Sequence, residues 1–325
     1  MEDLLMTLQL DLERISTRHK ENCRILAVIV NWNKGQLLVE CLNSLLAQEV
    51  PGMVVCVVDN ASQDNSIASV KTRFPEAETV ENTQNIGFAG ACRQALVLAR
   101  QCRTELLLIM NNDIVLEPGA IEELVKAVDE DPSIGVATPK IVFVSRPDKV
   151  WWFGGTISAK SGKTGHIGHR DARVDGVSAV VDSAYANGCM MLITKRVLDL
   201  PLDFEDRYFA YYEDADFSIR VRESGLRTVV VTGAVIRHHI SASSGGENSP
   251  GFAYYMTRNR LLFVKRNMRS ALTRVVLGAT LYEIPRQALR FLRRREIDHL
   301  RALARGYISG VLTIPNLDTI SERLT

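Results

Sequence analysis

Polar side chains able to bind a ligand or a metal ion follow three short apolar segments of the chain. They are Asn31 and Asn33 after ILAVIV, Asp59, Asn60 and Asp64 after VVCVV, and Asn111, Asn112 and Asp113 after LLLIM. A carboxylate accepts a hydrogen bond from a ring N–H and an amide bonds a ring carbonyl, so the second group suits a nucleotide base. A carboxylate that ends a buried strand, as Asp113 does, suits a hard divalent cation; an ordinary turn is the alternative.

A second acidic group follows the aromatic stretch YFAYY and consists of Glu213, Asp214 and Asp216. Three carboxylates this close repel one another, and an apolar setting raises a carboxyl pKa towards the working range of a general base. The alternative is the acidic first turn of a helix, which the helix dipole favours. We expect both, with Asp216 at the helix start and Asp214 facing a ligand crevice.

Histidines and a glycine turn supply further candidates. His238 and His239 end an apolar segment and precede the Ser/Gly-rich stretch 241–246, whose composition suits a lid over a substrate. Neutral imidazole is a common ligand of divalent cations, although a satisfied polar histidine is an equal alternative. Asn85 and Gly87 open a helix after a glycine turn, where backbone N–H groups can approach a ligand closely.

The remaining candidates are contacts to a diphosphate or to an acceptor. Arg258 follows two tyrosines on a helical stretch and is suited to bidentate binding of a diphosphate, with a solvated basic face as the alternative. Trp152, Gly188 and Glu213 complete this set. The chain holds neither a G-x-G-x-x-G fingerprint nor a P-loop sequence.

Alternating strands and helices must position these residues. Continuous apolar runs near 25–30, 54–58 and 106–110 are typical of parallel strands buried on both faces, and 35–48 and 88–102 carry a helical apolar stripe. This alternation predicts a doubly wound, Rossmann-like and mostly parallel sheet flanked by helices, in which ligands bind at the carboxyl ends of the strands. Residues 134–182 predict hairpins or a long loop, and 227–236 predict another strand.

Composition excludes several classes of protein. With 325 residues, 46% hydrophobic and 24% charged, the chain is an ordinary globular sequence, not a disordered or fibrous one. The net charge of +1 argues against a nucleic-acid partner. Six cysteines lack metal-site spacing and are interpreted as reduced core residues of a cytoplasmic protein. Neither a signal peptide nor a membrane-spanning run is expected.

Taken together, these motifs resemble the family 2 glycosyltransferases of the GT-A fold, and within them the bacterial rhamnosyltransferase-like branch. The resemblance runs from Ile25 to Lys265 through the following segments: VIVNWN, VVDNASQDNS, NIGFAGACRQAL, LLIMNNDIVLEPGAI, ANGCMMLITKRV, FAYYEDADFSIRVRESG, HHISASSGG and YYMTRNRLLFVKR. Each segment is loose alone, but their order and spacing are specific.

The resemblance implies a role for several residues. Asp59 matches the acid that reads uracil or thymine, Asp113 the metal ligand that ends a D-x-D motif, Asp214 the catalytic base, and His238 the histidine that completes the metal site, with His239 the less favoured register. Asn111 departs from the pattern, because the first acid of the D-x-D motif is missing. We therefore expect Mg²⁺ or Mn²⁺ to bind weakly unless the donor diphosphate is present.

The implied reaction is an inverting transfer of a sugar, with rhamnose favoured, to an acceptor hydroxyl. The donor is a dTDP- or UDP-linked sugar and the acceptor a glycan or lipid-linked molecule, in cell-surface polysaccharide or glycolipid synthesis. A metal-dependent nucleotidyltransferase is the alternative, although VIVNWNKGQ is a poor triphosphate loop. A nucleotide- or glycan-binding relative without turnover is another, and it would have no need of Asp214.

The expected domains are a helical lead-in (1–22), a catalytic domain (23–250) and a helical C-terminal segment (251–325). Within the last, residues 286–305 hold seven arginines against one Glu and one Asp and predict a basic amphipathic helix. Such a helix can lie on an anionic membrane surface, which would place the enzyme at the inner face of the cell membrane. A packed helix with a solvated basic face and a homodimer contact are the alternatives.

Overall fold

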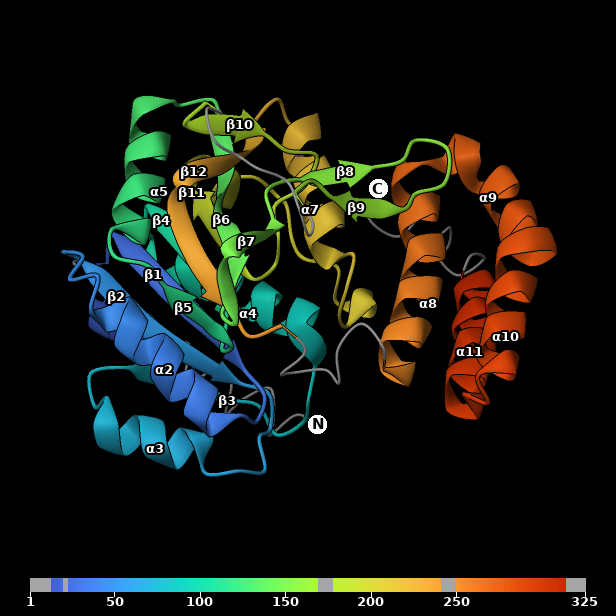
Figure 1. The fold of residues 1–325 in the computed structure, drawn as a ribbon. Helices are drawn as coiled ribbons and strands as arrows, with labels where there is room; N and C mark the ends of the chain where they lie inside the picture. Colours follow the sequence, from blue (N-terminus) through green and yellow to red (C-terminus); the bar gives the residue numbers. More distant parts are fainter. Residues whose placement is uncertain (1–12, 20–22, 169–177, 241–248, 314–325) are drawn as a thin grey trace. The chain divides into compact units, whose positions relative to one another are not determined.

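The computed structural model describes residues 13–19, 23–168, 178–240 and 249–313. These residues form two compact units, one drawn from 1–156, 166–209 and 213–243 and the other from 157–165, 210–212 and 244–325. The first unit contains the large sheet, and the second contains the C-terminal helices (Figure 1). The helical segment expected at 251–325 thus belongs to a unit that also includes two short pieces from earlier in the chain.

One half of the large sheet is parallel, as the apolar runs predicted. Its strands, in spatial order, are β3 (Glu78–Glu81), β2 (Met53–Asp59), β1 (Ile25–Asn31) and β4 (Leu106–Asn111). The parallel register places Asn31 opposite Asp59 and Val30 opposite Asn111. The polar residues that end these strands therefore meet at one edge of the sheet.

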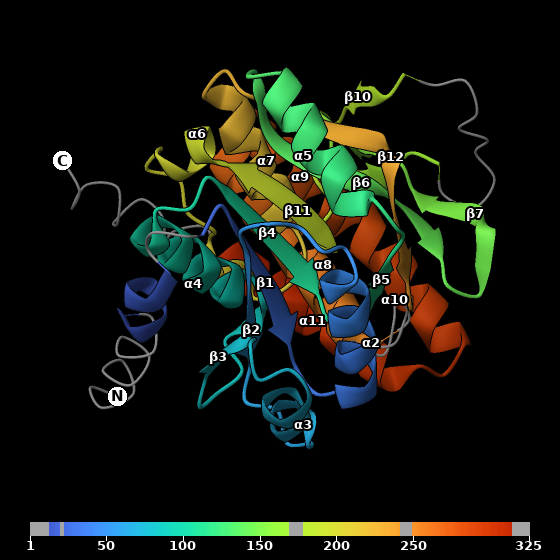
Figure 2. The ribbon, with the colours of Figure 1, turned by 90° about the vertical axis from the view of Figure 1, so that its left-hand side faces the viewer.

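The other half of the sheet is mixed. Its strands are β5 (Ile114–Leu116), β6 (Ile134–Phe143), β7 (Arg146–Trp152), β10 (Val180–Asp182), β11 (Met190–Thr194) and β12 (Arg227–His238). The strand β11 lies antiparallel between β4 and β6, and β12 pairs parallel with β6 (Figure 2). The α/β class is confirmed, but the continuous parallel half ends at β4, because the antiparallel strand β11 separates β4 from the parallel pair β6 and β12.

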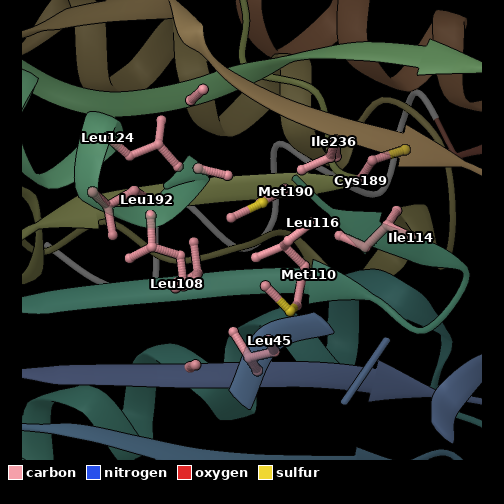
Figure 3. Close-up of a cluster of buried hydrophobic side chains, with 14 of the residues drawn as sticks. Leu45, Leu108, Met110, Ile114, Leu116, Leu124, Cys189, Met190, Leu192 and Ile236 are labelled. Carbon is pink, nitrogen blue, oxygen red and sulfur yellow. The ribbon is translucent and has the colours of Figure 1, made fainter. Parts of the chain in front are cut away.

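Helices cover both faces of the sheet and bury its alternating side chains. They are α2 (Gly35–Leu46), α3 (Ser66–Arg73) and α5 (Ala120–Glu130) against one hydrophobic cluster, and α4 (Gly87–Cys102), α6 (Lys195–Leu198) and α7 (Glu213–Glu223) against the other. Figure 3 shows part of the first cluster, with side chains from α2, α5, β4, β11 and β12 directed into it. Each fully buried leucine-sized side chain contributes about 1.5–3 kcal/mol. These two clusters therefore hold the strand ends in place.

The described part of the N-terminal lead-in, residues 13–19, is helical. Ile15 is buried in the second cluster, and the Glu78 carboxylate accepts hydrogen bonds from Arg14, Arg18 and His19 at 2.8, 2.8 and 2.9 Å. The leucines on which the helical prediction rested lie outside the described residues.

The second unit is mainly helical. It contains α8 (Pro250–Asn267), η2 (Arg269–Ala271), α9 (Leu272–Gly278), the π-helical turn η3 (Ala279–Glu283), α10 (Ile284–Arg293) and α11 (Ile297–Leu312). Earlier in the chain, β8 (Gly155–Ile157) pairs with β9 (Thr164–His166) as a separate two-stranded sheet. The single helix predicted over 286–305 is wrong: Arg295 takes a left-handed φ of 58° and separates α10 from α11. Among the described residues, no helix is both long and apolar enough to span a bilayer.

Candidate active site

Asn31 joins the ends of β1, β2 and β4. Its side chain is completely buried, and its Nδ2 donates to Asp59 Oδ1 at 2.6 Å. Its Oδ1 accepts a hydrogen bond from Asn112 Nδ2 at 2.7 Å. Asp59 also accepts hydrogen bonds from the backbone N–H and the hydroxyl of Ser62, at 2.9 and 2.5 Å. Asn31 thus holds Asp59 directly, and Asn112 holds it through Asn31. Because both amides are buried, the structure supports this positioning role for them.

The loop after β1 is held by two of the predicted nucleotide-binding residues. Asn33 takes a φ of 57°, and its Oδ1 accepts a hydrogen bond from Gln63 N at 2.8 Å. Asp64 accepts hydrogen bonds from the backbone N–H groups of Gly35 and Ser66, both at 3.0 Å. Burial would raise the pKa of Asp64, but hydrogen bonds from Ser66 and Gly35 lower it overall. Asp64 therefore stabilises the starts of α2 and α3 as an anion.

The glycine turn that opens α4 is hydrogen-bonded to the residue after β2. Asn60 Nδ2 donates to the Gly87 carbonyl at 3.0 Å, and Asn85 Oδ1 accepts from Gly87 N at 2.8 Å. Gly87 has a φ of 78°, and a Cβ at this position would overlap the carbonyl oxygen of Phe209. Only glycine fits both the backbone conformation and this close approach.

Asp113 and His238 meet at the junction of β4, β5 and β12. His238 Nε2 lies 3.2 Å from Asp113 Oδ1, and both side chains are largely buried. Cys189 Sγ lies 3.8 Å from His238 Nδ1 and also accepts a long hydrogen bond from Asn111 Nδ2 at 3.8 Å. Burial would lower the pKa of His238, but Cys189 and Asp113 raise it to about 10. The His239 side chain instead contacts Glu40 at 3.2 Å, and only the backbone N–H of His239 bonds Asp113, at its carbonyl oxygen.

The donor set at Asp113 and His238 fits a divalent cation that a nucleotide diphosphate helps to bind. A carboxylate oxygen and a neutral imidazole nitrogen are both ligands of Mn²⁺ or Mg²⁺ sites, so a cation bound here would displace the proton that Cys189 and Asp113 favour on His238. Within the described ranges, no group of three or more His, Cys, Asp or Glu side chains is arranged to hold a metal ion. These described residues therefore offer too few ligands for a closed metal site, and the remaining ligands would come from the diphosphate and water.

Asp214, partly buried, and Glu213, buried, form a carboxyl pair at the start of α7. Asp214 Oδ2 accepts a hydrogen bond from Gly188 N at 3.1 Å, and its Oδ1 accepts one from Ala215 N at 2.7 Å. Burial raises the pKa of Asp214 to about 6, against which these backbone hydrogen bonds act. Burial and the charge of Asp214 raise the pKa of Glu213 well above its usual value, and the buried Glu213 Oε2 has no hydrogen-bond partner among the residues that the structure describes. Glu213 is therefore the carboxyl that keeps its proton while Asp214 ionises.

Asp216 lies in the first turn of α7, as predicted, and it also has a structural role. It is completely buried, and its Oδ2 accepts hydrogen bonds from Arg220 at 2.8 and 3.0 Å. Tyr208 donates a further hydrogen bond to its Oδ1 at 3.2 Å. A buried carboxylate paired in this way is satisfied within the fold, which leaves Asp214 as the carboxylate at hand for chemistry.

The candidate residues of the first unit form a continuous series of contacts. Gly188 contacts Asp214, and its neighbour Cys189 contacts His238. His238 in turn pairs with Asp113. Asn112, next to Asp113 in the sequence, bonds Asn31 and through it Asp59. The structure thus brings the residues predicted from four distant parts of the chain to one end of one sheet.

Trp152 and Arg258 are placed differently. Trp152 is completely buried in the core, a position that does not favour the predicted contact with an acceptor. Arg258 belongs to the second unit and lies over the rings of Tyr254 and Tyr255, 5.9 Å from each centroid. Its contact with a diphosphate stays a prediction.

Two tryptophans of this region were not among the sequence candidates. Trp151 packs against His238 with 5.1 Å between ring centroids, on the opposite strand face from Trp152. Trp32 follows Asn31 and keeps 46% of its surface exposed. An aromatic residue directly after a buried strand was the signal available for Trp32, whereas nothing local distinguishes Trp151 from its neighbour.

An α/β sheet whose strand ends bring together carboxylates, amides and an imidazole has the architecture of GT-A glycosyltransferases. The similarity of the chain to known proteins supports this assignment. The model of the family described as "Glycosyltransferase like family 2" matches residues 23–260. The chain therefore belongs to glycosyltransferase family 2 and is a glycosyltransferase. This membership decides against the nucleotidyltransferase alternative.

Curated relatives include rhamnosyltransferases at low identity. The N-acetylglucosaminyl-diphospho-decaprenol L-rhamnosyltransferase of Mycobacterium tuberculosis is 24% identical over 296 residues, covering 83% of this chain and 95% of that protein. The O-antigen biosynthesis protein RfbC of Myxococcus xanthus is 25% identical over 240 residues, covering 69% of this chain and 18% of that protein.

Solved structures share the fold. The mannosyltransferase PcManGT from Pyrobaculum calidifontis, in complex with GDP-Man and Mn²⁺, aligns with a TM-score of 0.55 at 14% identity, covering 95% of this chain and 96% of that one. S. aureus TarS 1–349 in complex with UDP-GlcNAc also aligns with a TM-score of 0.55, at 15% identity, covering 87% of this chain and 80% of that one. At such identities the similarity concerns the fold.

Proposed function

We propose that this glycosyltransferase transfers its sugar with inversion of configuration and that Asp214 is the general base. The observation that carries the proposal is the environment of Asp214: a carboxylate oriented by two backbone N–H groups, with burial raising its pKa to about 6. A base with this pKa is ionised at neutral pH and still accepts a proton readily. It takes the proton of the acceptor hydroxyl as that oxygen attacks the anomeric carbon. The nucleoside diphosphate departs from the opposite face of the sugar, so one displacement inverts the configuration.

The donor is a nucleoside diphosphate sugar, with Asp59 at the base and Asp113 and His238 at the diphosphate. Support comes from the fixed position of Asp59 at the end of β2 and from the 3.2 Å contact of His238 with Asp113. A Mg²⁺ or Mn²⁺ ion held by Asp113 and His238 would offset the negative charge of the diphosphate. Asn111 in place of a third ligand carboxylate agrees with a cation that arrives with the donor.

We propose rhamnose as the sugar, dTDP-linked, and a glycan or lipid-linked acceptor in cell-surface polysaccharide or glycolipid synthesis. The support is the similarity to the mycobacterial rhamnosyltransferase, whose name gives a polyprenyl diphosphate sugar as its acceptor. A transfer assay with dTDP-rhamnose and competing UDP-sugars tests this choice. Turnover of a UDP-sugar alone would overturn it.

The base assignment is tested by a pair of isosteric variants. Asp214→Asn removes the base, and we expect transfer to fall by roughly 10²–10⁴-fold, while donor binding stays within several-fold. Glu213→Gln is the matched control, since a protonated Glu213 resembles the amide in charge and shape, so its activity should stay near that of the parent. Equal losses of donor binding and activity in Asp214→Asn, or a larger loss in Glu213→Gln, would contradict the assignment.

A further inference from the structure

The second unit exposes a row of large apolar side chains along α9, η3 and α10. Leu277, Leu281, Leu289 and Leu292 keep 54, 76, 48 and 51% of their surfaces exposed. They recur at helical spacing, so they lie along one side of this helical run. Of the exposed large hydrophobic residues in the described ranges, all except Trp32 and Ile167 lie between Leu277 and Leu312.

Arginines adjoin this row. Arg286, Arg290 and Arg293 follow one another at i, i+4 and i+7 on α10, beside Leu289 and Leu292. Within the part of the chain that the structure describes, none of the three pairs with a carboxylate, and Arg286 donates to the Tyr282 hydroxyl at 3.1 Å.

The nearby acidic residues are few, and two of the three are already paired. From residue 269 to residue 305 the chain has nine arginines and three acidic residues. Glu283 pairs with Lys163 at 3.0 Å and with Arg260 at 2.5 Å, and Asp298 pairs with Arg301 at 3.2 Å. The α9–α10 face, defined as Leu277 to Arg293, is therefore both apolar and strongly positive.

This combination of side chains decides which partner the face fits. A second copy in a two-fold dimer would bring two copies of the same positive patch together, and like charges brought together without partners are costly. An anionic lipid surface takes the leucines into its acyl boundary and pairs the arginines with lipid phosphates. We propose that the α9–α10 face lies in the interface of an anionic lipid membrane, parallel to its surface. This inference rests on the second unit alone and does not depend on the proposed donor or acceptor.

The test is flotation of the full-length protein with vesicles of phosphatidylcholine alone and of phosphatidylcholine mixed with phosphatidylglycerol. We expect binding to the mixed vesicles, and loss of most of it in about 1 M NaCl, where the Debye length falls to about 3 Å. The variant R286Q/R290Q/R293Q should bind about a hundredfold more weakly, because each arginine near an anionic surface contributes roughly a factor of five. The variant L281Q/L289Q/L292Q should bind mixed vesicles weakly at any salt concentration.

A charge-matched control is K126Q/R196Q/R222Q, which neutralises three exposed cations of the first unit. It should bind vesicles as the parent does, and circular-dichroism melting should show every variant folded. Equal binding to neutral and anionic vesicles, or no binding by the parent, would overturn the proposal. A dimer in analytical ultracentrifugation that only the leucine variant abolishes, without vesicle binding, would assign the face to a second copy instead.

Discussion

Two adjacent carboxyl groups at the start of α7 have different ionisation states because the charge of one disfavours a second charge beside it. Glu213 is buried and Asp214 is partly buried, but Asp214 accepts hydrogen bonds from two backbone N–H groups, which favour its charged form. Once Asp214 is ionised, its charge and burial hold the proton on Glu213. A pair of titratable groups whose environments separate their pKa values is the pattern expected of an acid–base site.

The first prediction at this scale is the pH dependence of transfer. Because Asp214 has a pKa of about 6, the base is ionised above that value and protonated below it. The kcat/KM value for the acceptor should therefore rise with pH through an apparent pKa near 6 and level off above neutral pH. A steady-state pH profile checks this, with Glu213→Gln expected to keep the same midpoint. A profile that stays flat from pH 8 down to about pH 5 would exclude a base with this pKa.

The second prediction concerns stability. The folded-state pKa of Asp214, about 6, lies above its ordinary value of 3.8, so the native state binds the proton more tightly than the unfolded chain. The stabilisation from this group is complete below 3.8 and is lost as pH rises through about 6. Asp214→Asn should thus gain up to about 3 kcal/mol of unfolding free energy relative to the parent at pH 8, less the lost backbone hydrogen bond.

Urea denaturation of both proteins at pH 8 and at about pH 4 measures this difference. The variant should lose its advantage at the lower pH, where the parent carboxyl is already protonated. An Asp214→Asn protein that is less stable than the parent by the same amount at both pH values would contradict the account.

At the scale of elements, the strand ends of the parallel half are tied together by one amide. Asn31 at the end of β1 bonds Asp59 at the end of β2 and Asn112 just after β4. The hydrophobic clusters fix where the strands run, and this buried amide fixes how their last side chains face. The base-binding carboxylate of the proposed function is therefore positioned by neighbours that need not touch the ligand.

Replacing Asn31 with alanine should accordingly damage both stability and donor binding. The change removes one hydrogen bond from the buried Asp59 carboxylate and one from the buried Asn112 amide, at a cost of about 2–4 kcal/mol in total. Urea denaturation and calorimetric titration with the nucleoside diphosphate measure the two effects. Thr72→Ala on the exposed side of α3 is the control and should change either quantity little. Unaltered nucleotide affinity in a folded Asn31→Ala protein would argue against this positioning role.

At the scale of the whole molecule, the cation and the donor are expected to bind together. The described residues supply Asp113 and His238 but no closed set of three metal-binding side chains. A metal that is held partly by the diphosphate couples the two ligands, since each completes the site of the other.

A thermal-shift series with Mn²⁺, the nucleoside diphosphate, and both tests this coupling. Both ligands together should stabilise the protein by more than the sum of the two single shifts, with about 2.7 kcal/mol expected when the donor is at a hundred times its Kd. Chelation with EDTA should remove most of the gain, and Asp113→Asn should lower it similarly. Additive shifts, or a nucleotide shift that EDTA leaves unchanged, would count against a shared site.

The sequence alone determined which polar residues end the strands and in what order, because strands buried on both faces read as continuous apolar runs. The polar residues that end those runs, such as Asp59 and Asp113, were therefore found without coordinates. The same local pattern predicted α7 and the strand that ends at His238, and each forms where it was expected.

Only the tertiary structure decided the features that depend on long-range packing. The antiparallel insertion of β11, the burial of Trp152 and the contact of Gly188 with Asp214 all depend on pairing between residues far apart in the chain. Periodicity reports which face of an element is apolar, but not which neighbour covers it. For that reason the pKa of Asp214, which burial and two backbone N–H groups set together, followed from the fold and not from the order of the residues.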